Sequence, residues 1–341
     1  MRRLTISTQD YRTHKPFRIA RGEKTSARQV LVTLRDGANT GRGACVPYGR
    51  YGETMDGVIT TIEACRAIVE DLGQSPVQIA AMLEGRIGGA ARNALDCALH
   101  DLAARQTGVP VWKQFNLPAP ATMATAMTIS VDDPEVMAAE AARLHDFPLL
   151  KLKLGGDDDD PLRVAAVHRV QPDARLILDA NESLTRAGLD RLSATLPWPQ
   201  IALIEQPLPA GLDADLTGYP YRDYLCADES IHGEDDLSRI AAHFGAVNIK
   251  LDKAGGIAPA IALARAARAI NLKVMIGCML GSSLAMAPAF MMNGLADYLD
   301  LDGPLLLRHD DSDGFTFTGG IMNPTRLWGY GGEVISFGLG M

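Results

Sequence analysis

Short apolar runs recur along the chain from about residue 122 onward, and most of the gaps between them have helical periodicity. An apolar run of this length, bounded by turn residues, is typical of a buried strand. Strands and helices that alternate at about 25 residues per unit predict parallel βα units. The runs are TAMTISV (125–131), PLLKLKL (148–154), RLILDAN (175–181), IALIEQP (201–207), YLCADES (224–230), AVNIKLD (246–252), KVMIGCM (273–279) and ADYLDLD (296–302).

The number of these units predicts a closed barrel. Eight parallel strands, each followed by a helix, form a (β/α)₈ barrel, so we predict an α/β fold built on a TIM-type barrel of seven or eight units. The segment 209–223 interrupts the pattern, because its many turn residues make a poor helix. The periodicity resumes after it.

The first third of the chain has a different pattern. RQVLVTLRDGANTGRGACVPY (28–48) predicts strands joined by an Asp-Gly turn, and helical stretches follow at 57–72 and 89–108. This combination predicts a separate α+β domain.

We therefore expect three parts in the chain. An α+β capping domain occupies residues 1–115, and the barrel with the functional site occupies 120–304, after a proline-containing linker. Residues 305–341 have many glycines and little periodicity, so we expect this C-terminal segment to pack back on the capping domain.

Composition and charge exclude several classes of partner. The 341-residue chain has a net charge of −8 and no basic stretch, which argues against nucleic acid. The N-terminus becomes polar before an apolar targeting segment develops, and no apolar run is long enough to cross a bilayer, so we expect a cytoplasmic protein without a membrane partner. The five cysteines are scattered and form no CxxC pair, which argues against a disulfide framework or a cysteine zinc site.

The stretch LLKLKLGG (149–156) places two lysines in a strand that should be buried. Side chains alternate between the faces of a strand, so Lys151 and Lys153 point the same way, opposite to the leucines. Burying two ammonium groups side by side is unfavourable unless a counter-charge lies nearby or one group loses its proton. This pair therefore predicts acidic residues in the same site.

Acidic residues follow at the ends of the next three strands, where barrels of this kind carry their chemistry. The residues Lys151, Asp179, Glu205, Asp228 and Lys250 follow one another at intervals of 22 to 28 residues, which matches the βα repeat. The three carboxylates can converge from adjacent strands. Three oxygen ligands with open positions suit Mg²⁺, so we predict a magnesium site here.

A second lysine strand completes the predicted chemistry. Lys153 and Lys250 should face each other across the barrel mouth with the metal at one side. Two opposed bases and a Lewis acid can remove a proton from one face of a carbon beside a carboxylate and return it to the other face. In this hypothesis Lys153 is the base, and Lys151 favours its deprotonation and helps to neutralise an enolate oxygen.

Simpler explanations exist for several charged residues. Exposure at a strand edge or capping of a helix could explain each strand-end lysine or carboxylate taken alone. Neither explains why all of them recur at the interval of the βα repeat. The acidic run 157–160 precedes Pro161 and a helical stretch, so we interpret it as a solvated helix start. By strand alternation, Glu229 should face away from the site and Lys253 should be structural.

Taken in order, these motifs resemble the enolase superfamily and its muconate-lactonising subgroup. The resemblance extends over essentially the whole chain, including the capping domain. The motifs that carry it are KLK (151–153), DAN (179–181), IEQP (204–207), ADES (227–230) and NIKLDKAGG (248–256).

The eighth strand separates the reactions that this subgroup performs, which include epimerisation, racemisation, cycloisomerisation and dehydration. DLDGP (300–304) resembles the feature of dipeptide epimerases in which two carboxylates hold the substrate's α-ammonium group. GCMLGSS (277–283), PFRIARG (16–22) and VPYGRYGE (46–53) are similar to bacterial L-Ala-D/L-Glu epimerases.

The resemblance implies a substrate-binding set. Asp300 and Asp302 would bind the ammonium of the alanine, while Arg21, or next Arg50, would pair with the glutamate side chain. Asn181 and Cys278 are further candidates for substrate contact. The resemblance also implies a Mg²⁺ cofactor, a homo-oligomer and a role in recycling cell-wall peptide.

Two other functions remain open at this stage. An N-acylamino-acid racemase or an o-succinylbenzoate synthase would use the same lysines and metal, but its substrate has no free ammonium for Asp300 and Asp302. A non-catalytic binding protein on an inherited barrel is the other alternative, and the intact lysines and metal carboxylates argue against it. The breadth of dipeptide specificity and the substrate face served by each lysine are left open.

Overall fold

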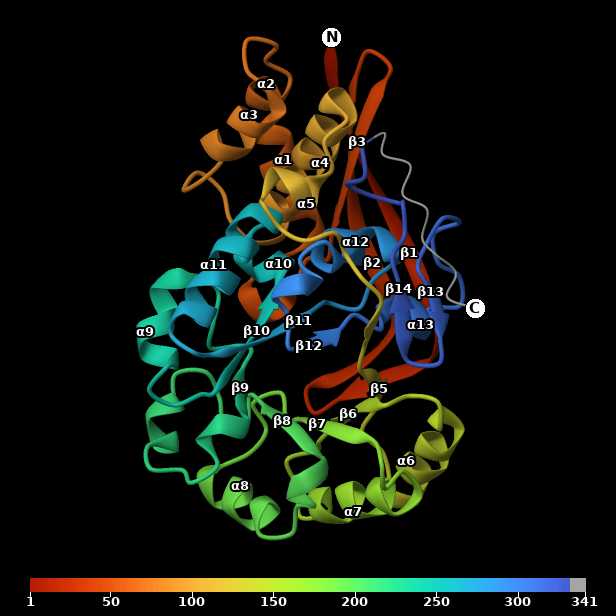
Figure 1. The fold of residues 1–341 in the computed structure, drawn as a ribbon, viewed down its shortest axis with the longest axis vertical. Helices are drawn as coiled ribbons and strands as arrows, with labels where there is room; N and C mark the ends of the chain where they lie inside the picture. Colours follow the sequence, from red (N-terminus) through yellow and green to blue (C-terminus); the bar gives the residue numbers. More distant parts are fainter. Residues whose placement is uncertain (332–341) are drawn as a thin grey trace.

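The computed structural model describes residues 1–331, and residues 332–341 lie outside the described part (Figure 1). Three sheets organise these residues: an antiparallel sheet near the N-terminus, an eight-stranded parallel sheet, and a small sheet near the C-terminus. The first packs against helices above the barrel that the second sheet forms (Figure 1).

The N-terminal sheet consists of β1 (Arg2–Ile19), β2 (Gly22–Asp36) and β3 (Asn39–Cys45) in that spatial order. The predicted Asp-Gly turn joins β2 to β3. Sequence analysis did not identify β1, which is long and mostly polar. The helices of this domain are α1 (Met55–Ala64), α2 (Arg66–Val69), α3 (Pro76–Met82), α4 (Gly89–Thr107) and α5 (Val111–Gln114).

Close packing of α4 on β3 fixes the core of this domain. A Cβ atom added at Gly41 would lie 2.2 Å from the carbonyl oxygen of Ala98, and one at Gly43 would lie 2.1 Å from that of Ala94. Only glycine lets the strand approach the helix backbone this closely. The alanine-rich face of α4 is buried in return.

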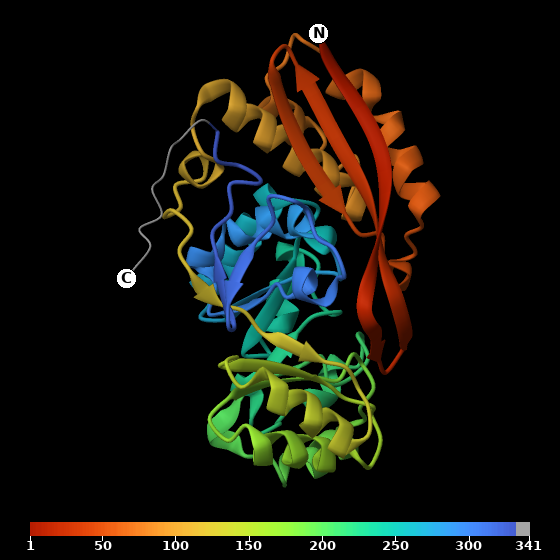
Figure 2. The same ribbon diagram turned by 90° about the vertical axis from the view of Figure 1, so that its right-hand side faces the viewer.

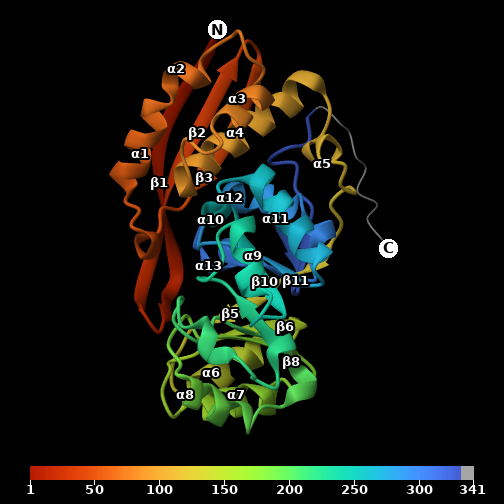
Figure 3. The ribbon, with the colours of Figure 1, turned by 90° about the vertical axis from the view of Figure 1, so that its left-hand side faces the viewer.

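The hairpin of β1 and β2 extends far beyond this core. Figures 2 and 3 show the two strands running down beside the barrel. The amide of Arg18 donates to Ser130 Oγ at 3.1 Å, and the carbonyl oxygen of Arg18 accepts from the Val131 amide at 3.3 Å. The hairpin tip, residues 17–24, therefore lies against the loop that follows the first barrel strand.

The parallel sheet confirms the predicted barrel of eight strands in sequential spatial order. Its two edge strands meet, because the amide of Ala126 donates to the carbonyl oxygen of Leu299 at 2.8 Å and Thr125 forms a parallel bridge with Leu299. The strands are β5 (Met127–Ile129), β6 (Leu149–Lys153), β7 (Arg175–Asp179), β8 (Ile201–Glu205), β9 (Leu225–Ala227), β10 (Ala246–Lys250), β11 (Lys273–Gly277) and β12 (Tyr298–Asp300).

Helices cover the outside of the barrel (Figures 1 and 3). After β8, where the sequence predicted a poor helix, two 3₁₀ turns at Asp213–Leu216 and Arg222–Tyr224 take its place. No helix within residues 1–331 combines the length and apolar character that crossing a bilayer requires. The barrel helices are α6 (Pro134–Ala141), α7 (Asp160–Val170), α8 (Arg186–Ser193), α9 (Leu237–Ile240), α10 (Leu251–Ala254), α11 (Ile257–Ala269), α12 (Ser283–Phe290) and α13 (Gly303–Leu306).

The described part of the C-terminal segment contacts both the barrel side and the N-terminal domain. Strands β13 (Thr316–Thr318) and β14 (Ile321–Asn323) extend the short strand β4 (Met123–Ala124). Farther on, the indole of Trp328 is fully buried and donates to the carbonyl oxygen of Arg42 at 2.8 Å. The segment thereby connects the barrel to β3.

A buried carboxyl group joins the barrel to the N-terminal domain. Asp252, on α10 directly after β10, accepts hydrogen bonds through Oδ1 from Asn93 Nδ2 at 2.8 Å and from the Val46 amide at 3.2 Å. Burial raises the pKa of Asp252 from 3.8 to about 7, although these hydrogen bonds and the charge of Lys250 oppose the change. The site therefore favours an uncharged side chain.

Replacing Asp252 by asparagine should stabilise the protein at alkaline pH. The folded-state pKa lies above the unfolded value, so the carboxyl contributes stability at low pH that is lost as the pH rises through 7. Asp252→Asn removes this penalty, which is about 4 kcal/mol for a shift of this size. Scanning calorimetry should give a higher Tm for the variant at pH 8 and a difference that shrinks toward pH 4.5. A difference independent of pH would contradict the assignment.

Candidate active site

A cavity of about 530 Å³ lies between the C-terminal ends of the barrel strands and two capping segments. One segment is the hairpin tip, and the other is the capping loop, residues 46–53, which contains a 3₁₀ turn at Gly49–Tyr51. The structure brings ten of the twelve predicted site residues to the cavity wall. Only Asp179 and Glu205 are absent from the lining, and both are buried beside Lys151.

Strand alternation on β6 is as predicted. Leu150 and Leu152 are fully buried in the core between barrel and helices, while Lys151 and Lys153 line the cavity. The ammonium group of Lys151 lies 2.6 Å from Asp300 Oδ2, 2.7 Å from Glu205 Oε2 and 3.0 Å from Asp179 Oδ2. The predicted counter-charge for the two lysines is therefore present.

These contacts decide the charge of Lys151. Burial disfavours the ammonium form, but the carboxylates of Asp179, Asp300 and Glu205 outweigh burial and raise the pKa of Lys151 well above its ordinary value. Lys151 therefore stays positive. Lys153 has fewer carboxylate contacts: its Nζ lies 2.6 Å from Asp179 Oδ2, and the ring of Phe17 from the hairpin tip lies 5.8 Å from Nζ.

The three predicted metal ligands stand at the ends of adjacent strands. Asp179 pairs with Glu205 in register, and Asp228 directly follows β9, the next strand. Burial opposes the charge of each group. For Asp179 the lysines Lys151 and Lys153 outweigh burial and lower the pKa, whereas burial and the charge of Asp179 raise the pKa of Glu205 to about 8.

The other side of the triad contacts Lys250 and Lys253. Lys250 Nζ lies 2.6 Å from Asp228 Oδ2, and Lys253 Nζ lies 2.6 Å from Oδ1 of the same carboxylate. These two ammonium groups outweigh burial and hold the pKa of Asp228 well below its ordinary value. Lys253, which we expected to be structural only, thus contacts a predicted metal ligand directly.

The expected direction of Glu229 is wrong. Its side chain is buried and its Oε1 lies 2.5 Å from Arg21 Nη2, beside the cavity rather than in solvent. Strand β9 ends at Ala227, so alternation with a period of two no longer applies at Asp228 and Glu229. The same reasoning explains why Lys253, on α10, reaches the site.

The donor set fits a hard divalent cation. Three carboxylates end on neighbouring strands beside the cavity, and Mg²⁺ prefers oxygen ligands. Asp179 and Asp228 both raise the pKa of Glu205 by repulsion, which a bound cation would relieve. In this structure the carboxylates face lysines instead, and within the described residues no three His, Cys, Asp or Glu side chains gather around one point as metal ligands do.

The carboxylates of Asp300 and Asp302 both reach the cavity. Asp300 is paired with Lys151, and Asp302 Oδ2 accepts a hydrogen bond from the Thr128 amide at 2.7 Å. Burial and the charge of Asp300 raise the pKa of Asp302 to about 6. Two acidic groups that repel each other in a cavity wall can bind a cationic group of a ligand.

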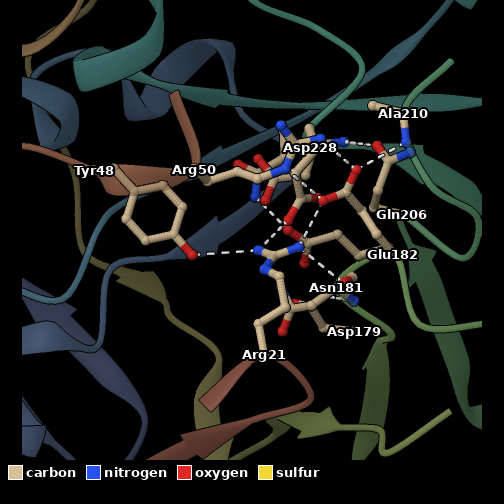
Figure 4. A network of polar contacts seen from close by, with 12 residues as sticks. Arg21, Tyr48, Arg50, Asp179, Asn181, Glu182, Gln206, Ala210 and Asp228 are labelled. Carbon is tan, nitrogen blue, oxygen red and sulfur yellow. Dashed lines mark hydrogen bonds and ion pairs between the residues drawn. The ribbon is translucent and has the colours of Figure 1, made fainter. Parts of the chain in front are cut away.

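The two predicted arginines are bound to barrel carboxylates. Arg21 contacts Glu182 at 2.8 Å and Glu229 at 2.5 Å, and Arg50 donates twice to Glu182, at 2.9 and 2.8 Å (Figure 4). Asn181 lies beside them, and its carbonyl oxygen accepts from Arg21 at 2.8 Å. In this structure both arginines thus form ion pairs within the protein. The predicted pairing of an arginine with the substrate would have to replace or share these contacts.

Sequence reasoning missed Lys24, which lines the same cavity. Its Nζ lies 4.7 Å from the centre of the Tyr48 ring, and no described carboxylate forms an ion pair with it. Burial lowers the pKa of Lys24, and the charges of Lys250 and Arg21 lower it further. The signal in the sequence is its position three residues after Arg21, across the hairpin turn.

Cys278 is also part of the cavity wall, directly after β11. Burial raises the pKa of its thiol well above the ordinary value, and the charges of Asp300 and Asp302 act in the same direction. Cys278 is therefore a neutral wall residue.

Comparison with known proteins assigns the chain to a family. A model described as the N-terminal domain of mandelate racemase and muconate lactonizing enzyme matches residues 1–115, and one described as enolase C-terminal domain-like matches residues 136–335. The chain belongs to the enolase superfamily. Members of this superfamily that resemble it include racemases and epimerases, and the chain is an isomerase.

Two curated relatives in the superfamily have almost the same similarity to this chain. The L-Ala-D/L-Glu epimerase of Escherichia coli K12 is 39% identical, over 94% of this chain and 99% of that protein. The N-acetyl-D-glutamate racemase of a Pseudoalteromonas species is 38% identical, over 88% of this chain and 95% of that protein.

Solved structures of superfamily members that are similar to this chain are also described as dipeptide epimerases or as homologous to them. An Agrobacterium tumefaciens member with homology to dipeptide epimerases, with bound sodium and L-Ala-L-Glu, is 42% identical with a TM-score of 0.90, and the match covers 96% of this chain and 100% of that one. A Methylococcus capsulatus dipeptide epimerase complexed with Mg and L-Arg-D-Lys is 32% identical with a TM-score of 0.89, over 96% and 98% of the chains.

Proposed function

We propose that the protein is a Mg²⁺-dependent dipeptide epimerase that interconverts L-Ala-D-Glu and L-Ala-L-Glu. The observation that carries this proposal is the placement of Lys153 and Lys250 in one cavity with the acidic pair Asp300 and Asp302. The names of the epimerase relatives and the dipeptides bound to solved neighbours support it.

The two lysines stand on opposite sides of the barrel. Strands β6 and β10 lie four places apart in the eight-stranded order, so Lys153 and Lys250 approach the cavity from opposing walls. One lysine removes the α-proton from one face of the glutamate carbon, and the other lysine delivers a proton to the opposite face. The configuration at that carbon is inverted.

The remaining charges stabilise the reacting group. Asp179, Glu205 and Asp228 would hold Mg²⁺, which when bound supplies a Lewis acid that withdraws charge from the substrate's α-carboxylate. Lys151 stays positive because of its carboxylate neighbours, so it remains a fixed cation where negative charge develops.

The ends of the dipeptide would be bound by opposite charges. Asp300 and Asp302 bind the α-ammonium group of the alanine. For the glutamate side chain, Lys24 is a better candidate than Arg21 or Arg50, because both arginines are already paired with carboxylates. We further propose that the enzyme is a cytoplasmic homo-oligomer that recycles cell-wall peptide.

An N-acylamino-acid racemase is the alternative within the same chemistry. One relative bears the name N-acetyl-D-glutamate racemase. N-acetylglutamate shares the glutamate half of the dipeptide but lacks the ammonium group, so the acidic pair would have no ligand. An o-succinylbenzoate synthase is disfavoured for the same reason.

The first test is proton NMR in D₂O with L-Ala-D-Glu and Mg²⁺. We expect the glutamate α-proton signal to disappear while L-Ala-L-Glu forms. Lys153→Ala and Lys250→Ala should each abolish exchange from one diastereomer only, which also assigns each lysine to a face. Asp158→Asn, at an exposed position, serves as the matched control.

Two outcomes would contradict this assignment. Equal residual exchange from both diastereomers in the lysine variants would exclude the two-base mechanism. If calorimetry shows that Mg²⁺ binds but the dipeptide shows no exchange, the dipeptide is excluded as the substrate. N-acetyl-D-glutamate would then be assayed in its place.

The acidic pair separates the two substrate classes. Asp302→Asn should raise the KM for L-Ala-D-Glu at least tenfold and leave any turnover of N-acetyl-D-glutamate unchanged, because only the dipeptide carries an ammonium group. Since the pKa of Asp302 is about 6, the wild-type KM for the dipeptide should rise as the pH falls below that value. An unchanged KM in the variant would remove the main support for a dipeptide.

Lys24 is tested by a change of substrate. Lys24→Met should raise the KM for L-Ala-D-Glu at least tenfold, because the distal carboxylate loses its cation, and should have little effect on L-Ala-D-Met. Lys24→Arg keeps the charge and should retain the preference for glutamate. If Lys24→Met left the KM for L-Ala-D-Glu intact, one of the arginines would have to fill this role.

A further inference from the structure

Three residues beside the candidate metal site have left-handed backbone conformations. Asn181 has φ 45°, Glu182 has φ 70° and Gln206 has φ 34°, which residues with a side chain rarely adopt. Hydrogen bonds hold this backbone in place: the Glu182 amide donates to the carbonyl oxygen of Gln206 at 2.9 Å. Such a conformation persists only where surrounding contacts fix it.

This backbone conformation directs the Glu182 carboxylate toward the two arginines of the capping segments. The carboxylate accepts from Arg21 Nη1 at 2.8 Å, from Arg50 Nε at 2.9 Å and Nη2 at 2.8 Å, and from the Ala210 amide at 2.8 Å (Figure 4). Its side chain is only 9% exposed. One carboxylate thus receives four hydrogen bonds, three of them from guanidinium groups.

The two arginines come from different capping segments. Arg21 lies in the hairpin tip and Arg50 in the capping loop, and both segments line the cavity. Arg21 also donates to the hydroxyl of Tyr48 at 3.2 Å, which links the two segments to each other. Glu182 is therefore a point of the barrel at which both segments are fastened.

This arrangement bears on how a ligand enters the cavity. The segments form one side of the cavity and the barrel forms the other, so parting them widens the entrance. We propose that Glu182 is a positioning residue that latches the hairpin tip and the capping loop over the bound substrate, and that its arginine pairs break and re-form in each catalytic cycle. This latch goes beyond the proposed function, although its kinetic test rests on that function.

Amide hydrogen exchange tests the latch without any assay of turnover. In the full-length protein with Mg²⁺, Glu182→Gln should speed exchange in peptides covering 17–24 and 46–53 at least fivefold, because Arg50 loses its charged partner and Arg21 keeps only Glu229. Peptides from β10 should exchange as in the wild type, which shows that the barrel stays folded.

Glu135→Gln is the matched control. Glu135 also forms a two-point ion pair with an arginine, since Arg169 Nη2 lies 3.0 and 2.8 Å from its two oxygens, but this pair is exposed on the outer helices. This variant should leave exchange in both capping segments unchanged. Unchanged exchange in Glu182→Gln as well would overturn the latch.

Kinetics with the dipeptide give a second readout. Glu182→Gln should raise KM at least fivefold and change kcat less than twofold, because the lysines are untouched. Arg50→Gln should act in the same way, and the double variant should be little worse than either single one. Additive losses would overturn the latch, because independent sites add.

The failures of the two proposals can be told apart. If the dipeptide is not turned over but exchange in the capping segments rises in Glu182→Gln, the latch stands and the substrate assignment fails. If the dipeptide is turned over and exchange in the segments does not change, the substrate assignment stands and the latch fails.

Discussion

The compensation of buried charge at the barrel mouth is the constraint on which the rest of the structure depends. A buried ion without a partner destabilises a fold by several kcal/mol, and removing one member of a buried pair costs about 3–5 kcal/mol. Here the acidic and basic groups come from separate strands and from α10, and they are held within 3.0 Å of each other. The groups concerned are Asp179, Glu205, Asp228, Lys151, Lys153, Lys250 and Lys253.

The same constraint explains how one site can be both stable and reactive. Lys151 contacts three carboxylates, which raise its pKa and fix its charge. Lys253 contacts Asp228 Oδ1 and two backbone carbonyl oxygens. Lys153 and Lys250 each contact a single carboxylate and border the cavity. The groups with the fewest internal partners are therefore those that face a ligand.

The sequence predicts strand positions and side-chain directions well where the backbone is a regular strand, and poorly elsewhere. The eight barrel strands and the shared direction of Lys151 and Lys153 followed from alternation with a period of two, and the structure confirms both. Alternation failed just beyond strand ends, as at Glu229. Strand β1 was missed because its apolar positions are few, as suits an edge strand that pairs with β2.

Contacts between distant segments were beyond the reach of the sequence. Arg21 could be identified as a charged residue of a capping segment, but its partner Glu182 lies 161 residues away and reaches it through an unusual backbone conformation. Lys24 became a candidate only once both arginines were found to be occupied. Which of several cations is left to bind a ligand depends on which carboxylates lie near each one. That can be read only from the folded chain.

The burial of Trp328 has a consequence for the order in which the molecule is made. Its indole fills a position against β3 and α4 and donates to the carbonyl oxygens of Arg42 and Cys97. Domains generally fold from the N-terminus as they leave the ribosome. The face of the first domain that Trp328 covers therefore stays uncovered until almost the whole chain has emerged, and the barrel is translated before its cap is complete.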